Sequence, residues 1–174
     1  KNKAYGVAFN AFTGNIVGIQ NGDAITPTYA SAGAPAAAAA GTYPITVTLN
    51  DPNNRLPNYI VTLNTGTLTV GGNTLIVTPA DKTKVYGSVF AAFTGTIVGL
   101  QPGDVITATY ASTGAAVNAA IGDYPITVTL NDPGNKLPNY TVILNVGTLS
   151  VTPRALTVTP DNKAKAFGAV FNAF

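Results

Sequence analysis

The chain repeats itself at a fixed spacing. Residues 3–70 align with residues 84–151, an offset of 81, without any insertion or deletion, and 47 of the 68 aligned positions are identical. A third copy begins at Leu156 and runs to Phe174. A gapless period of this size indicates tandem domains of one fold, because one large fold has no reason to repeat its sequence in register. The chain is therefore built from one small unit used more than once.

The phase of the repeat predicts where each unit lies. The segment that opens the second copy, Leu75–Pro79 (LIVTP), recurs as Leu156–Pro160 (LTVTP), and its equivalent in the first copy would precede Lys1. Linkers of three or four residues cannot hold neighbours apart, so we expect the units to touch end to end. The expected organisation is a first repeat over 1–70 that lacks its opening strand, a complete second repeat over 75–151, the start of a third over 155–174, and linkers at 71–74 and 152–154.

The residue inventory argues against an enzyme. The sequence has no His and no Cys, and all seven of its acidic residues are Asp. Without His or Cys there is no Ser-His or Cys-His nucleophile and no ordinary zinc site. General acid–base chemistry would be left to Asp, Lys or Tyr. We therefore predict no enzymatic activity and no cofactor.

Charge and hydrophobicity exclude two classes of partner. Charged residues make up 9% of the chain, the net charge is +2, and the Lys and Arg residues form no stripe, so we expect no nucleic-acid surface. No apolar run approaches the ~20 residues that span a bilayer, so we expect no membrane span in this segment.

Short strands punctuated by turns dominate each repeat. In Tyr43–Leu49 and its copy Tyr124–Leu130, apolar residues alternate with Pro and Thr, which is typical of a strand with one buried face. The close spacing predicts an antiparallel meander, while the region around Lys84–Gly87 is interpreted as loop-like. Further strands are expected at Tyr59–Asn64, with Tyr59, Val61 and Leu63 inward, and at Thr67–Val70, Leu75–Pro79, Ile97–Leu100, Val105–Tyr110 and Leu156–Pro160.

The Ala-rich segment Ala34–Ala40 is the one stretch that suggests a helix. It has no cap and no amphipathic stripe, and seven residues are too few for a stable isolated helix, so we interpret it as a loop. The predicted fold class is all-β, with tandem antiparallel β-sandwich-like (Ig-like) repeat domains in line and no helix of note. A β-grasp-like unit is the alternative, and a helix packed on a sheet would support it.

Aromatic residues recur at matching places and are predicted to be structural anchors of each core. A sugar-stacking surface is the alternative, but their inward phase favours packing, with hydroxyls that reach the backbone. Tyr43 follows Gly41 at a strand start, which is the placement of a tyrosine corner. The predicted anchors are Tyr5, Phe9, Phe12, Tyr43, Tyr59, Tyr86, Phe90, Phe93, Tyr124 and Tyr140.

Two Asn/Asp loops are the sharpest candidate metal sites. Asp51, Asn53 and Asp132 offer oxygen ligands of the kind that Ca²⁺ binds. Each loop holds one carboxylate, so we favour turns closed by side-chain-to-backbone bonds and expect no metal. Asp23 and Asp104, in NGD and PGD turns, are interpreted as turn caps in the same way.

An ordered set of motifs resembles a known family. Lys84-Val85-Tyr86-Gly87, Gly99–Asp104 (GLQPGD), Gly122–Ile126 (GDYPI) and Asn139-Tyr140 followed by Gly147–Pro153 (GTLSVTP) resemble the MBG domain of the YGX type. The resemblance covers both full repeats and the start of the third. It implies a β-rich extracellular repeat of large bacterial surface or secreted proteins, many adhesin-like, and it implies no catalytic residues.

We therefore expect a stalk or spacer segment of a long extracellular bacterial adhesin or surface filament. One alternative is a weak multivalent module that binds a glycan, a protein or a solid surface. Expected partners are neighbouring repeats or identical chains, with an unspecified surface ligand if the module binds. A second alternative is a head-to-tail filament, in which the C-terminal segment of one chain completes the first repeat of the next. Against this filament we favour a window on a longer covalent array.

Overall fold

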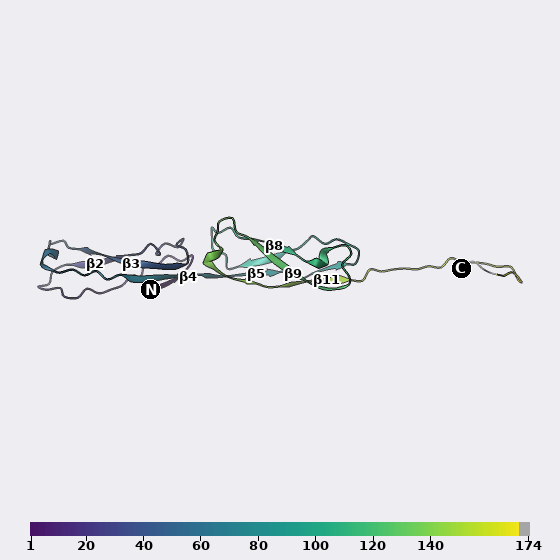
Figure 1. Cartoon of the computed structure of the whole chain (residues 1–174), viewed down its shortest axis with the longest axis horizontal. Helices are drawn as coiled ribbons and strands as arrows, with labels where there is room; N and C mark the ends of the chain where they lie inside the picture. The colour runs from purple at the N-terminus through teal and green to yellow at the C-terminus, as the bar shows by residue number, and fades with distance from the viewer. Residues whose placement is uncertain (171–174) are drawn as a thin grey trace.

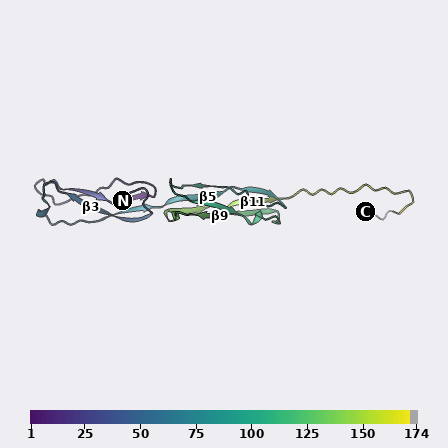
Figure 2. The same cartoon turned by 90° about the horizontal axis from the view of Figure 1, so that it is seen from above.

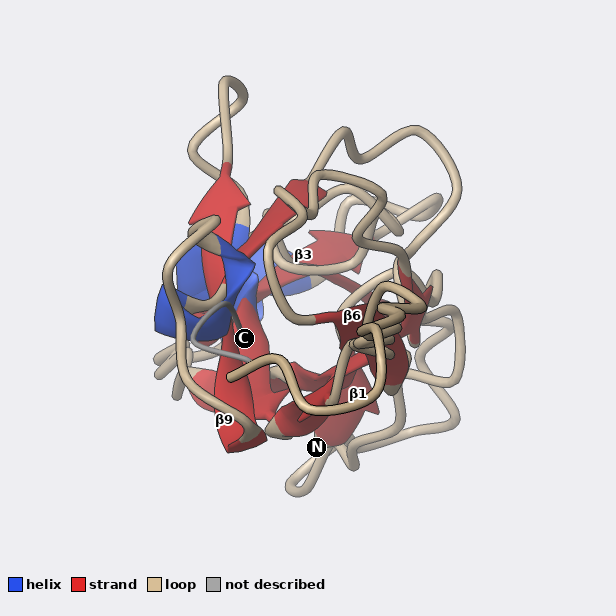
Figure 3. Ribbon diagram, turned by 90° about the vertical axis from the view of Figure 1, so that its right-hand side faces the viewer, coloured by secondary structure: helices blue, strands red, loops and turns tan. Residues whose placement is uncertain are grey.

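The computed structural model describes residues 1–170 as two elongated units that lie end to end, followed by an extended segment (Figures 1 and 2). Viewed along the long axis, the strands of the two units overlap in projection (Figure 3). The first unit contains β1 (Asn2–Ala4), β2 (Thr26–Ala30), β3 (Gly41–Asn50) and β4 (Gly66–Gly71). The second contains β5 (Asn73–Pro79), β6 (Lys82–Val85), β7 (Gly95–Val98), β8 (Thr107–Ala111), β9 (Gly122–Asn131), β10 (Tyr140–Leu144) and β11 (Gly147–Thr152).

The all-β prediction is confirmed. The only helical elements within residues 1–170 are three 3-10 turns of three residues each, Leu56–Asn58, Thr113–Ala115 and Leu137–Asn139. The Ala-rich segment forms turns and bends, as predicted. Among the described residues no helix is long and apolar enough to cross a membrane.

The second unit has two sheets, with strand orders β10-β5-β7 and β6-β11-β9-β8. The chain passes from one sheet to the other between β5 and β6, and β5 packs against β9. Leu75 and Val77 on β5, Ile126 on β9 and Leu149 on β11 are all 0% exposed. The buried side chains of β5 therefore lie at the centre of this unit's core.

The alternating pattern is confirmed on β3 and β9. In both strands the threonines are exposed and the apolar side chains between them are buried or half-buried. The reason is that successive residues of a strand point to opposite faces. The predicted antiparallel meander is wrong, because β3 pairs directly with β4 and β9 directly with β11, while β10 lies in the other sheet. β5 pairs in parallel with β10, and β6 pairs in parallel with β11. The opening strands pair with the distant closing strands, and Lys84 and Val85, interpreted as loop, belong to β6.

The first unit keeps only one of the two sheets. Its strand order, β1-β4-β3-β2, corresponds to β6-β11-β9-β8. The predicted strand Tyr59–Asn64 is wrong for this unit: no strand covers it, and Val61 and Leu63 are 46% and 53% exposed rather than inward. The segment has no strand partner here, because the equivalent of β5 would precede Lys1. The inward prediction also fails beside β5, since the counterparts Val142 and Leu144 are 37% and 47% exposed.

Leu156–Pro160 is also not in a sheet, although a strand was expected there. Leu156 and Val158 are 89% and 81% exposed, and the segment extends away from the second unit (Figure 1). Its sequence nearly repeats β5, but no described strand lies beside it to supply backbone partners. Residues 171–174, the end of the expected third repeat, lie outside the described residues.

Candidate interface between repeats

A polar cluster lies where the two units meet. Gly72 alone separates β4 from β5. The parallel pairing of β1 with β4 places Ala4 beside Gly71, so the following residue, Tyr5, lies at the end of the first unit that faces the second. The backbone N–H of Tyr5 donates to the Gly71 carbonyl at 2.8 Å, which fixes the direction of the chain there.

Two tyrosines from different units share one carboxylate. The Tyr5 hydroxyl donates to Asp104, with distances of 3.0 Å to Oδ1 and 2.9 Å to Oδ2. The Tyr140 hydroxyl donates to Asp104 Oδ2 at 2.5 Å and accepts from the Gln101 backbone N–H at 3.0 Å. The two rings meet edge to face, with centroids 5.7 Å apart. We call Tyr5, Gln101, Asp104 and Tyr140 the tyrosine joint.

An apolar cluster supports the tyrosine joint. Tyr5 and Val70 of the first unit pack with Leu75, Ile106 and Tyr140 of the second, and each of the five is at most 8% exposed. Burial of this kind stabilises an interface by about 25 cal/mol per Å² of apolar surface removed from water. The joint is therefore a continuous piece of core that runs from one unit into the next.

Backbone conformation explains the glycine of the Tyr-Gly pair. Gly6 has φ of +84°, which residues with a side chain rarely adopt. A Cβ at this position would also lie 2.0 Å from Gln101 Oε1 and would displace the end of that side chain. Nearby, the Ala40 N–H donates to Asn139 Oδ1 at 2.9 Å, a second polar link between the units.

Both tyrosines of the joint are held in the neutral form. Burial, followed by the hydrogen bond to Asp104, raises the pKa of Tyr140 to about 12. The same two causes, in the same order, raise the pKa of Tyr5. A neutral phenol donates to a carboxylate, so the arrangement is a binding contact that is stable at neutral pH.

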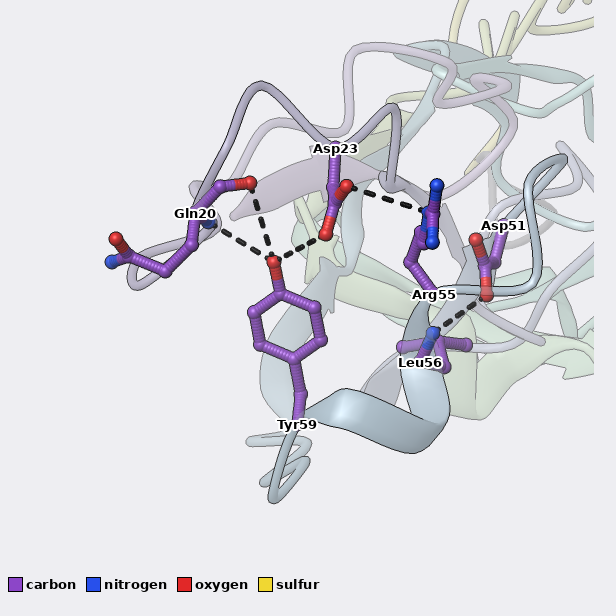
Figure 4. A network of polar contacts seen from close by, with 6 residues as sticks. All are labelled: Gln20, Asp23, Asp51, Arg55, Leu56 and Tyr59. Atoms are coloured by element: carbon purple, nitrogen blue, oxygen red, sulfur yellow. Dashed lines mark hydrogen bonds and ion pairs between the residues drawn. The ribbon is translucent and has the colours of Figure 1, made fainter.

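The leading end of the first unit carries the same acceptor group without a partner unit (Figure 4). The Tyr59 hydroxyl donates to Asp23 Oδ2 at 2.7 Å and accepts from the Gln20 N–H at 3.0 Å, as Tyr140 does in the joint. Arg55 Nε lies 3.8 Å from Asp23 Oδ1. Asp23 and Asp104 were interpreted as turn caps, but their carboxylates bind tyrosine hydroxyls.

The trailing end of the second unit presents the matching tyrosine. Tyr86 is the equivalent of Tyr5, yet it is 45% exposed where Tyr5 is 4% exposed. The expectation that Tyr86 anchors the core of its own unit is therefore wrong. The ring of this position packs against the next unit, not its own, and no described unit follows Tyr86.

The other predicted anchors lie within single units. Phe9 packs edge to face on Phe12, and Phe90 on Phe93, with centroids 5.0 and 4.9 Å apart. The Tyr43 hydroxyl donates to the Ala39 carbonyl at 2.9 Å, and the Tyr124 hydroxyl donates to Ala120 at 3.1 Å. These backbone bonds confirm the predicted reach of the hydroxyls to the backbone.

The calcium candidates close turns. Asp51 Oδ2 accepts from the Leu56 N–H at 2.7 Å, and Asp132 accepts from the N–H groups of Lys136 and Leu137 at 2.9 and 2.8 Å. Backbone N–H groups of Arg55 and Leu56 lower the pKa of Asp51. Asn53 is exposed. Within residues 1–170 no three acidic side chains come together as metal ligands would.

A groove of about 570 Å³ runs along the open side of the first unit. Its walls are the segments 13–19 and 59–66, and its floor includes Ile45, Val47 and Leu49 of β3. The wall segments correspond to β7 and β10, so the groove occupies the position that β5 fills in the second unit. We call it the strand groove.

Sequence reasoning missed the tyrosine joint but anticipated the strand groove, because the opening strand of the first copy was expected to precede Lys1. The residues of the joint do recur in the sequence, because both of the first two copies contain a Tyr-Gly pair and a Gly-Asp pair. What the repeat could not show is that the tyrosine of one copy meets the aspartate of the next. The signal for the groove was the absent opening strand of the first copy.

The family model described as MBG domain (YGX type) matches residues 1–69 and 75–150. The chain therefore belongs to the MBG domain family of the YGX type, and the two matches coincide with the two units. No curated protein matches the chain, and no solved structure does.

Proposed function

We propose that the chain is a stalk or spacer segment of a long extracellular surface protein of a bacterium. The tyrosine joint is the observation that carries the proposal. It buries Tyr5 of one unit against Asp104 and Tyr140 of the next, while only Gly72 separates β4 from β5. A joint that is both short and packed holds successive units in line, and repetition then sets length.

The surface chemistry favours a spacer over a binding module. A module that binds through avidity presents the same pocket or the same aromatic group on every repeat. The tyrosines that recur on the flanks of both units, Tyr29, Tyr43, Tyr110 and Tyr124, are half-buried. The hydroxyls of Tyr43 and Tyr124 are bound to backbone carbonyls, so these rings are not a free stacking surface. A glycan array probed with the chain checks this, and reproducible binding of any glycan contradicts a pure spacer.

Rigidity is tested with a matched pair of variants. Asp104→Ala leaves two buried hydroxyls in the joint without their acceptor, which costs about 1–3 kcal/mol for each group left unpaired. Asp23→Ala makes the same change at the leading end, where no unit is joined. Small-angle X-ray scattering should show bending for Asp104→Ala and the parent rod shape for Asp23→Ala. Equal scattering from all three proteins would contradict the role given to the joint.

The spacer role is tested in the producing cell. Deletion of residues 71–151 removes one period and joins Val70 to Thr152, which repeats the native Val151–Thr152 junction. A spacer predicts a shorter surface projection with unchanged adhesion per molecule, measured by immunogold labelling of intact cells. Loss of adhesion in proportion to the repeats removed would favour the binding module instead.

A further inference from the structure

We propose that the ammonium of Lys3 is a positioning group for the tyrosine joint, because it ties the Tyr-Gly turn of the first unit to the Ala-rich loop and so presents both to the second unit. The inference rests on the proposed spacer role, since it assigns a further residue to the joint on which that role depends. We call Lys3, Val7 and Pro35, and their equivalents Lys84, Ser88 and Ala116, the lysine clasps of the two units.

The two clasp lysines are buried. Lys3 on β1 and Lys84 on β6 are 9% and 6% exposed, and each lies between two exposed neighbours of its strand. Neither ammonium forms an ion pair with any residue of the described range 1–170. Burial lowers the pKa of Lys3, which reflects the cost of taking its charge out of water. A buried cation without an acid beside it needs other polar partners.

Backbone carbonyls from two segments bind each ammonium. Lys3 Nζ donates to the Val7 carbonyl at 2.8 Å and to the Pro35 carbonyl, which is 32 residues away in sequence. In the second unit, Lys84 Nζ donates in the same way to the equivalent carbonyls of Ser88 and Ala116. An ammonium has three donors and no acceptor, and its charge strengthens such bonds. Each lysine therefore fastens the turn after its own strand to a distant loop.

In the first unit, these two fastened segments are the ones that contact the second unit. Tyr5, whose hydroxyl donates to the shared carboxylate of the joint, lies two residues before Val7. Ala40, whose N–H donates to Asn139 of the second unit, lies five residues after Pro35. The clasp therefore holds the two contacts of the first unit in a fixed position relative to one another.

Neutral backbone bonds join the same turn and loop. The Phe9 N–H donates to the Ala34 carbonyl at 2.8 Å, and the Gly6 N–H donates to the Ala36 carbonyl at 3.1 Å. A neutral side chain in place of Lys3 would leave these bonds but remove the one charged donor. We expect the turn and the loop then to separate more often, with the first unit still folded around its sheet.

The second unit supplies a matched control. It has the same clasp, but Tyr86, which precedes Ser88 as Tyr5 precedes Val7, is 45% exposed and packs in no described joint. Loss of the Lys84 charge should therefore loosen the turn and the loop of the second unit and leave the tyrosine joint intact.

Amide exchange in the full chain compares Lys3→Met with Lys84→Met. The N–H groups of Phe9 and Phe90, which bond to the two loops, report the clasps, and the N–H of Gln101, which bonds to the tyrosine joint, reports the joint. Lys3→Met should accelerate exchange at Phe9 and at Gln101 by about tenfold. Lys84→Met should accelerate exchange at Phe90 and leave Gln101 unchanged. Unchanged protection of the β3 amides in Lys3→Met would show that the joint opens without unfolding of the first unit.

Chemical rescue isolates the charge. The chain has no Cys, so in Lys3→Cys a single thiol can be alkylated in the unfolded chain before refolding. Displacement of bromide from 2-bromoethylamine by the thiolate restores an ammonium at the length of lysine, and 1-bromopropane gives a neutral side chain of the same length. The aminoethyl form should exchange at Gln101 like the parent, and the propyl form should exchange like Lys3→Met.

Three results would overturn the inference. The first is unchanged exchange at Gln101 in Lys3→Met, and the second is equal rescue by both alkyl groups. The third is loss of β3 protection in both Lys3→Met and the propyl form, which would make the lysine a requirement for folding and not a positioning group of the joint. If Asp104→Ala bends the rod while Lys3→Met leaves the joint unchanged, this inference alone fails and the spacer proposal stands.

Discussion

The two units have 47 of 68 aligned residues in common, but the second has seven strands and the first has four. Residues 95–98 (GTIV) form β7, while residues 14–17 (GNIV) form no strand. The difference is traced to β5, which pairs with both β7 and β10. The comparison teaches that strand formation here depends on a partner backbone, because an unpaired edge gains no hydrogen bonds from becoming extended.

The largest effect should come from the core of β5. Leu75→Ala removes a fully buried side chain at the centre of the second unit, and the cost should be about 2–5 kcal/mol of unfolding free energy. Leu156→Ala, the same change in the exposed copy, should stay within about 0.5 kcal/mol in dilute, monomeric protein. Urea unfolding measures both. Equal costs would show that β5 does not support the second unit as described.

Two equivalent glycines, Gly99 and Gly18, test whether the position that β5 fills in the second unit is open in the first. Gly99 and Gly18 both have φ of +93°, but a Cβ at Gly99 would lie 2.0 Å from the Thr74 carbonyl oxygen, and one at Gly18 meets nothing within 4 Å. Alanine should cost about 1–3 kcal/mol in backbone strain at either site, and about 1–3 kcal/mol more at Gly99, where β5 must shift. Thermal unfolding measures the loss of stability in the two variants. A larger loss for Gly18→Ala than for Gly99→Ala would contradict the placement of β5 beside Gly99.

Alkaline pH should open the joint. The pKa of Tyr140 is raised from 10.0 to about 12, so its contribution to stability is complete below pH 10 and is lost as the pH rises through about 12. Tyrosinate absorbance should show Tyr140 among the last tyrosines to ionise, together with bending seen by X-ray scattering. Asp104→Asn should lower this pKa. A titration unchanged by that variant would contradict the assigned hydrogen bond.

The smallest effect should be the loss of stability of the first unit at acidic pH. Backbone N–H groups lower the pKa of Asp51 below its usual 3.8, so its contribution is present above that value and is lost as the pH falls through the lower folded pKa. Asp51→Asn keeps an acceptor oxygen but cannot titrate, and it should flatten the pH dependence of the first unit, measured by amide exchange. Asp132→Asn is the matched change in the second unit. If Asp51→Asn left the acid dependence unchanged, another group would control it.

Local pattern predicted much of the fold. The alternation of apolar and polar residues in Tyr43–Leu49 was enough to place β3, because every second side chain of a strand on a core faces that core. Asp51 was correctly expected to bind backbone, since one carboxylate among Asn and Pro residues favours a turn. The parallel pairing of β6 with β11 was not predictable, because it joins residues about 67 apart.

The site was less predictable than the fold. Tyr5 and Tyr86 have the same neighbours in sequence, so no local argument distinguishes a buried ring from an exposed one. Their difference depends on whether a following unit supplies an aspartate. Val61 and Leu63 were expected to point inward because they lie on one face of the predicted strand Tyr59–Asn64. The structure leaves them 46% and 53% exposed, and their copies Val142 and Leu144 are 37% and 47% exposed beside β5.

The parallel pairing of β6 with β11 also determines how the second unit responds to a pull. β6, which follows the opening strand β5, points the same way as the last strand β11, and the chain leaves β11 at the end opposite to the tyrosine joint (Figure 1). A stretching force applied through the two neighbours acts along these strands and loads the bonds of the four register pairs from Leu149–Lys82 to Thr152–Val85 together in shear. Such a pair must slide as a whole before it parts, whereas an antiparallel hairpin under the same load would open one bond at a time.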